Sequence, residues 1–495
     1  MEHSKKRIPL NAWPFYTLTL TLFLFLAGKG LLATGMFADG LIYDCIAQNM
    51  ADGIGSLWHP VCTETYLNDF HEHPTLAIFL LSLFHRLLGN GLGVCRLYSL
   101  LMFSITGLLI VRLWQYVSGS LRNAWLPLLL WVLTIGVART SYSNLLEVSM
   151  APLVLGSVLM TLRAYNARLL SSHVIDLFVA GILLSAAFFV KGFTGLYPLV
   201  FPLLLASSGY GAEYQTRWYN RLLRAIADSA YIALGMIVPI ALILVFNDDA
   251  RDYLTTYYNG QVVNGIQYAL VENRSYILQA FVERTSLVWI IFALLLLNRW
   301  IASYKGKGLS YQLCDKKLIN TLFLLTLFGV IPIMISLKQR SFYILTVYPF
   351  FATVIAATVN PSITTLMRRG STRRGHIVIF CVSTFLIGAA CGFQSINYGK
   401  PDRDATLQND AKIISTRLNN GERVALPPTM YDAPSLHGYY YRDYRVSLDA
   451  NDQQHQLRHL LVPEQEMLQG TGLDTIYHEI ELPTQQYKLY ELKQK

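Results

Sequence analysis

Residues 13–50 read WPFYTLTLTLFLFLAGKGLLATGMF-ADGLIYDCIAQNM, an apolar run that ends in an acidic segment. The run from Trp13 to Phe37 can cross a bilayer, because a spanning helix needs about 20 mostly apolar residues. It follows basic residues 5–7 in the manner of a signal peptide, but it is too long for one and no small-residue cleavage site follows it. The run therefore predicts an uncleaved first span, with Asp39 just beyond its end.

The rest of the chain also has the composition of an integral membrane protein. Of its 495 residues, 53% are hydrophobic and only 14% are charged, whereas soluble domains have about 25% charged residues. The same length rule predicts eleven spans, at about 13–36, 93–114, 123–139, 147–165, 174–190, 194–208, 229–246, 286–303, 318–336, 341–358 and 376–393. The apolar stretch 75–88 is too short to cross, and we expect it to lie on the outer surface.

Lysine and arginine residues predict the orientation, because short positively charged loops stay in the cytoplasm. With the N-terminus inside, the inner segments hold most of the loop cations, and the outer face is richer in acids. Topology and contact with anionic lipid then explain the net charge of +9, so nucleic acid is not expected as a partner. The sequence predicts a multi-pass protein of the bacterial inner membrane, with a cytoplasmic N-terminus and a periplasmic C-terminus.

Two domains are predicted. Residues 1–393 form the transmembrane domain, with a first outer loop at 38–92 that carries juxtamembrane helices and a second large outer loop at 247–285. Residues 394–495 contain no further span. Helical and extended patterns alternate there, at 405–418 and 433–441 for helices and at 423–426, 445–448, 459–462 and 487–490 for strands. This alternation predicts a small α/β domain in the periplasm.

Cysteine and histidine spacings give no structural zinc site.

Cys45 and Cys62 share the first outer loop and Cys95 lies near its end. Two of the three would form a disulfide in an oxidising periplasm, and free buried thiols are the alternative.

A divalent metal is the one cofactor for which the sequence offers candidate ligands. Glu72 with His71 or His73 offers oxygen and imidazole ligands of the kind that zinc accepts. Two neighbouring residues on a loop are weak evidence, and solvated histidines explain them better. We expect that no metal or other cofactor is required.

Three acids lie at the predicted outer ends of helices. Asp39 and Asp44 are five residues apart, so they do not share one face of a helix and should differ in role. Glu147 follows the polar segment 139–144 and faces the same compartment as Asp39, and the cost of a charge at a membrane indicates a function. The alternatives for Asp39 are a solvated loop acid or a helix N-cap, and the alternative for Glu147 is an ion pair with Arg139.

Cations gather at the same predicted surface. Lys191 ends one span and begins the next with almost no loop between them. Lys338 and Arg340 lie in a very short outer hairpin that breaks the positive-inside pattern, which favours an anionic ligand. Arg96, ahead of the second predicted span, is a further outer cation. The alternative to a ligand-binding role for Lys191 is that its side chain only extends from the helix end to the membrane surface.

Several short motifs occur in an order typical of one enzyme family. Asp39, Tyr43, Ile46, Ala47 and Met50 lie at helical spacing after the first span, and the further segments are Glu72-His73-Pro74-Thr75-Leu76, Arg96-Leu97, Ala187-Phe188-Phe189-Val190-Lys191-Gly192 and Tyr343-Ile344-Leu345-Thr346-Val347-Tyr348-Pro349. They resemble motifs of the polytopic glycosyltransferases of the dolichyl-phosphate-mannose protein mannosyltransferase type, which include the bacterial aminoarabinose lipid A transferases. The resemblance implies the GT-C fold for an α-helical polytopic membrane protein.

Three positions depart from that family. Gly40 stands where the family commonly has Glu. Ile42 stands where the aminoarabinose transferases have Arg, and His73 where they have Lys. The loss of two cations near the donor site means that aminoarabinose is not assigned as the sugar.

The resemblance implies an inverting transferase, which moves a hexosyl or pentosyl group from a polyprenyl phosphate carrier to lipid A, another glycan or a protein at the periplasmic face. A leaving lipid phosphate needs positive groups around it, and the expected ligands are Lys191, Arg340, Lys338, Tyr343, His73 and Arg96. Asp39 is the expected base for the acceptor hydroxyl, with Glu147 as the second candidate. The acceptor is expected near Asp44, Glu72 and Arg139.

Two other classes of protein remain open at this point. A transporter or lipid flippase is favoured by Lys29 inside the first span, but it would predict repeats and charged or broken helices at the midplane. A non-catalytic partner of a cell-envelope complex is the third interpretation, with the outer domain as its docking surface.

Overall fold

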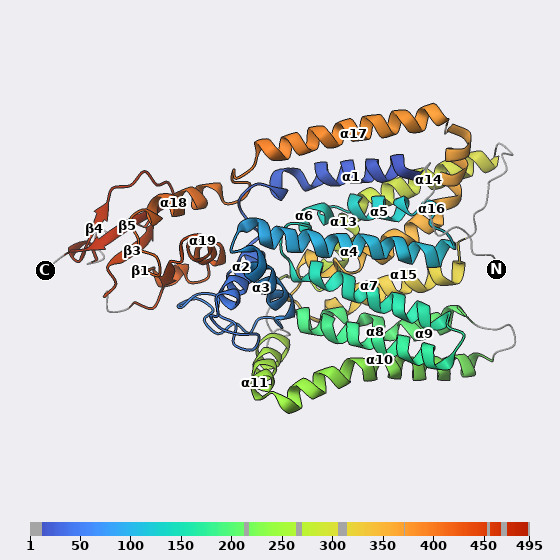
Figure 1. Ribbon diagram of the computed structural model, residues 1–495, viewed down its shortest axis with the longest axis horizontal. Coiled ribbons are helices and arrows are strands. Elements are labelled where there is room, and N and C mark those ends of the chain that lie inside the picture. Colours follow the sequence, from blue (N-terminus) through green and yellow to red (C-terminus); the bar gives the residue numbers. More distant parts are fainter. Residues whose placement is uncertain are drawn as a thin grey trace.

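A helical bundle carries a small sheet-containing domain at one end (Figure 1). The computed structural model describes residues 12–211, 217–263, 270–304, 314–370, 372–452, 456–466 and 473–493. Five of the cations in the predicted inner segments lie outside the described residues, namely Lys5, Lys6, Arg7, Lys305 and Lys307.

Eight described helices are long and apolar enough to span a membrane. They are α1 (Trp13–Ala27) with η2 (Gly28–Leu31), α4 (Leu92–Ser118), α7 (Leu146–Tyr165), α8 (Leu170–Lys191) with η3 (Gly192–Gly195), α10 (Trp218–Phe246), α15 (Lys316–Val330) with η6 (Ile331–Ile335), α16 (Tyr348–Gly370) and α17 (Arg373–Ile396). The pair α13 (Tyr276–Arg284) and α14 (Ser286–Tyr304), bent by 56°, gives a ninth if it counts as one span. The predicted total of eleven is not confirmed.

The other two predicted spans are divided into shorter helices. Segment 123–139 forms α5 (Trp125–Leu133) and α6 (Val137–Thr140), separated at Gly136, whose φ of 89° suits glycine. Segment 194–208 forms η4 (Tyr197–Val200) and α9 (Phe201–Ser208). Both η4 and α9 have a proline in their first turn, where a missing N–H is tolerated. The chain therefore starts a new helix at each proline instead of continuing one long helix.

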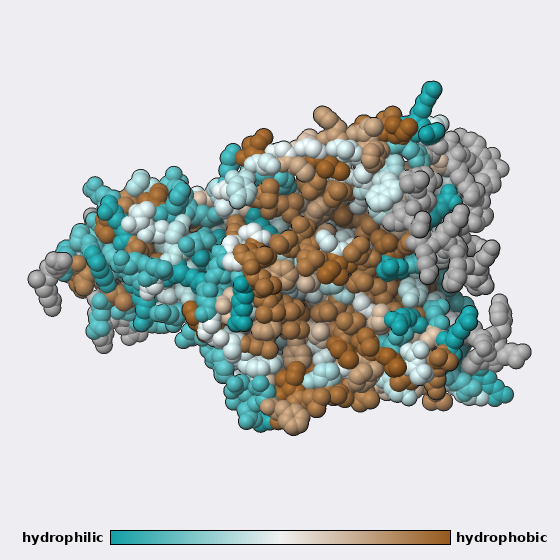
Figure 2. All heavy atoms as spheres, in the orientation of Figure 1, coloured by the Kyte–Doolittle hydropathy of each residue, from teal (hydrophilic) through white to brown (hydrophobic). Residues whose placement is uncertain are grey.

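An apolar belt covers the bundle in Figure 2, between the hydrophilic C-terminal domain and a more polar opposite end. Helices α10 and α17 contribute strongly to it, since only 11% of the most apolar window of each is buried. Large exposed side chains such as Phe246 and Phe385 would be unfavourable in water but are stable against lipid. The chain is therefore a polytopic membrane protein.

Two helices of the predicted first outer loop lie between the bundle and the C-terminal domain: α2 (Ala38–Ala51) and α3 (Leu76–Leu88) (Figure 1). Helix α3 confirms that the stretch 75–88 forms a helix shorter than a span. His85 Nε2 and Asp44 Oδ1, 2.9 Å apart and both buried, join the two helices. The second loop begins with α11 (Asp248–Tyr257) and the π-helical η5 (Tyr258–Val263).

All six cysteines are free thiols, and Cys45, Cys62 and Cys95 are buried. The disulfide among these three is therefore not formed in the structure. Cys62 is held near α2 by its carbonyl oxygen, which accepts a 2.9 Å hydrogen bond from the side chain of Asn49.

In its described residues, the C-terminal domain contains a five-stranded sheet and two main helices, α18 (Ala405–Ser415) and α19 (Pro434–Tyr444). The strand order is β2-β1-β3-β5-β4, for β1 (Arg423–Ala425), β2 (Ser447–Asp449), β3 (His459–Pro463), β4 (Tyr477–Ile480) and β5 (Tyr487–Leu492). Strand β1 pairs in parallel with β2 and β3, and β5 pairs in antiparallel with β3 and β4. The predicted helices and four predicted strands are confirmed, while β4 was missed. Short turns η8 (Pro428–Met430) and η9 (Leu473–Thr475) complete the domain.

Helix α19 packs on α2 and so attaches this domain to the first outer loop. The Met36 N–H, just ahead of α2, donates a 3.0 Å hydrogen bond to the Tyr439 hydroxyl. Further along, the Tyr441 hydroxyl donates to Asn49 Oδ1 at 3.0 Å. The C-terminal domain therefore supports the helix that carries Asp39.

Candidate active site

Asp39 lies in the first turn of α2, where the helix dipole favours a carboxylate. The turn is pressed against the connection between α6 and α7. Asn144 Nδ2 donates a 3.0 Å hydrogen bond to the Gly40 carbonyl, and a Cβ on Gly40 would collide with the Ser143 carbonyl oxygen. The family's Glu therefore has no room at position 40, which gives a physical reason for this departure.

Burial and nearby cations change the pKa of Asp39 in opposite directions. Burial raises the pKa of the carboxyl group, while the positive charges of Lys191 and Arg340 act to lower it. The net result is a pKa above the ordinary value. The two cations are thus close enough to stabilise the carboxylate, although they do not offset the whole cost of burial.

Lys191 is the last residue of α8, where a cation interacts favourably with the helix dipole. Gly192 ends the helix with a φ of 71°. Lys191 pairs with Glu147, in the first turn of α7, and the two side chains are only 4% and 0% exposed. Glu147 is therefore bonded to Lys191 and not to Arg139, the partner that the sequence suggested as an alternative. Its second oxygen, Oε2, is buried without a hydrogen-bond partner in the described structure.

The predicted hairpin after α15 supplies an aromatic surface below Lys191. Turn η7 (Ser341–Ile344) places the Tyr343 ring centroid 4.8 Å and the Phe342 centroid 5.3 Å from Lys191 Nζ. Such cation–π contacts hold an ammonium group in place. Burial raises the pKa of Tyr343, so its hydroxyl is protonated and can donate a hydrogen bond. Arg340 directly precedes this turn.

A second group of ionisable residues contains Glu72, His73 and Lys338. Burial raises the pKa of Glu72, and the charge of Lys338 opposes this change. Burial and the nearby charges of Lys191 and Lys338 hold the pKa of His73 well below its usual range. His73 is therefore neutral, so it does not replace the positive charge of the family's Lys at this position. Lys338 also donates a hydrogen bond to Gln261.

Two predicted site residues have other partners. Asp44 is fully buried and accepts hydrogen bonds from His85 and, at 3.3 Å, from Gln48. The guanidinium of Arg96 is also buried, and it donates to the backbone carbonyls of Leu31 and Gly35 at 3.3 and 2.8 Å. Both therefore stabilise the connection around α2, and neither lines the cavity described next.

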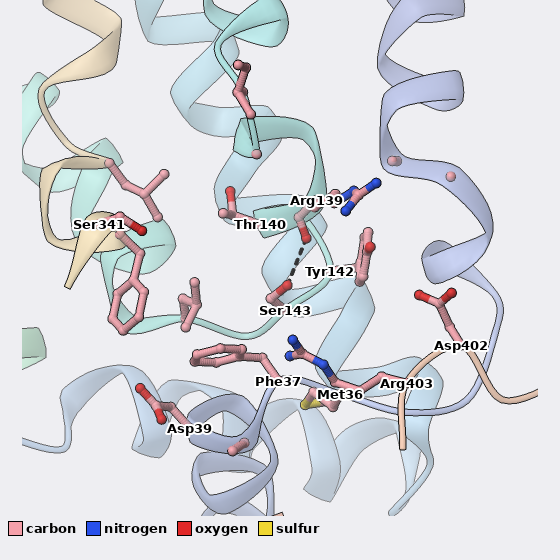
Figure 3. Close-up of a pocket in the computed structure, with 18 of the residues that line it drawn as sticks. Met36, Phe37, Asp39, Arg139, Thr140, Tyr142, Ser143, Ser341, Asp402 and Arg403 are labelled. Atoms are coloured by element: carbon pink, nitrogen blue, oxygen red, sulfur yellow. Dashed lines mark hydrogen bonds between the residues drawn. The ribbon is translucent and has the colours of Figure 1, made fainter. Parts of the chain in front are cut away.

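A cavity of about 1230 Å³ opens beside Asp39 (Figure 3). Arg139 and Arg340 line it as well, so three of the predicted site residues share one space. Charged residues that the sequence did not nominate for the site line it too: Lys29, Arg284, Asp402 and Arg403. A lysine within an apolar span was the one signal available, because the others approach from distant parts of the chain.

No group of three or more His, Cys, Asp or Glu side chains is placed to hold a metal ion in the part of the chain that the structure describes. The imidazole of His71 stacks on Tyr253, with ring centroids 4.7 Å apart, and its Nδ1 lies 3.4 Å from Asp69 Oδ1. His71, one of the side chains suggested for a metal, thus has partners within the protein.

Solved structures with the same fold are known, although no protein-family model and no curated protein sequence matches the chain. ArnT from Cupriavidus metallidurans bound to undecaprenyl phosphate has a TM-score of 0.65 and 13% identity, over 97% of this chain and 98% of its own. Its apo state has a TM-score of 0.61 and 11% identity, over 96% of each chain. The archaeal oligosaccharyltransferase AglB from Archaeoglobus fulgidus, in complex with an inhibitory peptide and a dolichol phosphate, has a TM-score of 0.51 and 10% identity, over 90% of this chain and 69% of its own.

These similarities establish the fold. The chain has the GT-C fold, as the sequence motifs predicted. Its likeness to ArnT extends through the C-terminal domain, since nearly the whole of both chains is covered.

Proposed function

We propose that the protein is an inverting glycosyltransferase, which moves one sugar from a polyprenyl phosphate carrier to an acceptor at the periplasmic face of the inner membrane. The observation that carries the proposal is the placement of Asp39 beside Lys191 and Arg340, in a fold shared with an enzyme that binds undecaprenyl phosphate. A carboxylate next to two cations at a membrane surface offers a base and a phosphate site together.

The cations would hold the donor phosphate. Lys191, Arg340 and the Tyr343 hydroxyl can donate to its oxygens, and Lys338 lies in the same hairpin. Charge builds on the phosphate oxygen as the bond to the sugar C1 breaks, and cations fixed in advance stabilise that charge without rearrangement. The departing group is the polyprenyl phosphate itself.

Asp39 would act on the acceptor. Its carboxylate takes the proton of the acceptor hydroxyl as the oxygen forms a bond to C1 from the face opposite the phosphate. The proton therefore moves to Asp39 while the phosphate leaves with the bonding electrons. Glu147 is the second candidate base, but its ion pair with Lys191 engages it in holding the cation.

Lys29 was the one feature that favoured a transporter, and its position in the structure does not support that function. Lys29 lies in η2 at the end of the first span and pairs with Asp402 at 3.4 Å, so it is not an isolated charge at the bilayer midplane.

The test is turnover by purified protein in nanodiscs. Polyprenyl phosphate sugars with a radiolabelled hexose or pentose are incubated with the protein and with extracted envelope glycolipids, and the products are separated by charge and mass. We expect label to pass to one glycolipid or glycan and unlabelled carrier phosphate to appear in equal amount. Donors that stay intact with every acceptor fraction, while the protein binds them, would support the non-catalytic interpretation instead.

A further inference from the structure

Positive charge in the cavity exceeds negative charge. Five cations line it against two acids, namely Lys29, Arg139, Arg284, Arg340 and Arg403 against Asp39 and Asp402. Within the described residues, Lys29 is the one cation of these five that forms an ion pair. A concave site with excess charge of one sign concentrates ions of the opposite sign. The cavity therefore suits an anionic ligand.

Aromatic rings separate part of this charge from the donor site. The guanidinium carbon of Arg403 lies 5.2 Å from the centroid of Phe37. Phe37 in turn meets Phe342 edge to face, with centroids 5.6 Å apart, and Lys191 lies on Phe342. Two rings therefore stand between Arg403 and Lys191, and a phosphate bound at Lys191 leaves Arg403 free for another group.

The charges beyond Phe37 form a distinct cluster, which we call the linker subsite: Lys29, Arg139, Tyr142, Asp402 and Arg403. Figure 3 shows Arg139, Tyr142, Asp402 and Arg403 on one side of Phe37 and Asp39 on the other. Burial raises the pKa of Tyr142, so its hydroxyl remains a donor.

Backbone pairing fixes this subsite. The linker between α17 and α18 runs beside the end of the first span, where the Thr34 N–H donates to the Lys400 carbonyl at 2.8 Å and the Asp402 N–H donates to the Thr34 carbonyl at 3.0 Å. Gly35 allows the close approach, since a Cβ there would lie 2.7 Å from the Arg403 carbonyl oxygen. Backbone hydrogen bonds to Thr34 thus fix the segment that carries Asp402 and Arg403, so these two residues are held in position at the cavity.

We propose that the linker subsite binds an anionic group of the acceptor, a phosphate or a carboxylate, and thereby presents the acceptor hydroxyl to Asp39 across Phe37. Arg403 and Arg139 are the principal ligands, because the planar guanidinium fork matches both anions. Lys29, held by Asp402, adds a further charge. The inference rests on the proposed function and names the chemical class of the acceptor.

The experiment measures binding of small probes with the donor site already filled. Purified protein in phosphatidylcholine nanodiscs is saturated with undecaprenyl phosphate, and binding of glucose 6-phosphate, glucuronate and glucose is followed by ligand-observed NMR. The variants are Arg403→Gln and Arg403→Lys, with Arg251→Gln as the matched control, since Arg251 is an exposed arginine on α11.

We expect both anionic sugars to bind at least about tenfold more tightly than glucose, because hydrogen bonds to charged groups are the strong ones. Arg403→Gln should remove this preference, Arg403→Lys should keep part of it, and Arg251→Gln should not change it. Equal affinity for glucose and the anionic sugars in the wild type, or a preference that survives Arg403→Gln, would overturn the proposal.

A second arm separates an acceptor from a lipid headgroup. Nanodiscs with anionic phosphatidylglycerol supply membrane phosphates, and if these occupy the subsite, the anionic sugars lose affinity in the wild type alone. That result would overturn the acceptor assignment. Donor affinity is measured separately with fluorescent undecaprenyl phosphate, so failure of the proposed donor site is distinguished from failure of this inference.

Discussion

Replacing Asp39 with Asn keeps the size of the side chain and much of its hydrogen bonding, but the amide cannot accept the proton of an acceptor hydroxyl. General-base catalysis contributes about 10²- to 10⁴-fold, so we expect sugar transfer to fall by that factor. This is about 3–5 kcal/mol in activation free energy. Donor affinity should be unchanged or higher, because the substitution removes a negative charge beside Lys191 and Arg340.

The pH dependence follows from the raised pKa of Asp39. The carboxylate is the competent base, and it is lost as pH falls through the pKa of the folded protein. Transfer should therefore decline at a higher pH than for an ordinary aspartate, whose pKa is about 3.9. The remaining activity of Asp39→Asn should not show this decline at acidic pH.

The assay compares initial rates of transfer by purified protein in nanodiscs at saturating donor, from mildly acidic to neutral pH. Asp248→Asn is the matched control, because this acid also begins a helix but its side chain is 85% exposed. A folded Asp39→Asn protein with a near wild-type rate and the same pH profile would refute the role of Asp39, and Glu147 would become the leading candidate base.

Three further predictions address the rest of the site and its setting. Lys191→Ala and Arg340→Ala should each weaken binding of polyprenyl phosphate about tenfold or more, through lost charge-assisted hydrogen bonds; unchanged donor affinity in both would contradict the phosphate site. Gly40→Glu should lower thermal stability by about 1–3 kcal/mol or more, because a side chain has no space there, whereas Gly93→Glu, where a Cβ meets nothing within 4 Å, should not. A reporter active only outside the cytoplasm should be active when fused after Lys495, and an inactive fusion, shown to be expressed, would reverse the proposed orientation.

The helices and the hairpin after α15 were predictable because their signals are local. Apolar runs predicted α7 and α8, and the charges that break these patterns, Glu147 and Lys191, lie at the helix ends where the structure pairs them. The spans at 123–139 and 194–208 were overestimated, since hydropathy does not register the divisions at a glycine with positive φ or at proline-initiated turns. Length and composition thus predicted the class of fold better than the number of crossings.

The cavity could not be predicted, because distant segments build it. Arg403 reaches it only because the linker pairs with the backbone near Thr34, a contact that leaves no pattern in either segment. Arg96 shows how little a local pattern reveals about the partners of a side chain. A cation at an outer helix end suggested a phosphate ligand, but the backbone carbonyls of Leu31 and Gly35 take up its guanidinium.

The hydrogen bond between Met36 and Tyr439 joins residues that are 403 positions apart in the chain. During synthesis, the first span and α2 leave the ribosome long before α19 exists, and contacts between such distant segments form late. A nascent or truncated chain would therefore insert its helices into the bilayer without the support that holds Asp39 in register. If Asp39 is the base, a chain that ends before α19 should therefore not transfer sugar, because Asp39 is positioned only after the C-terminal domain has folded.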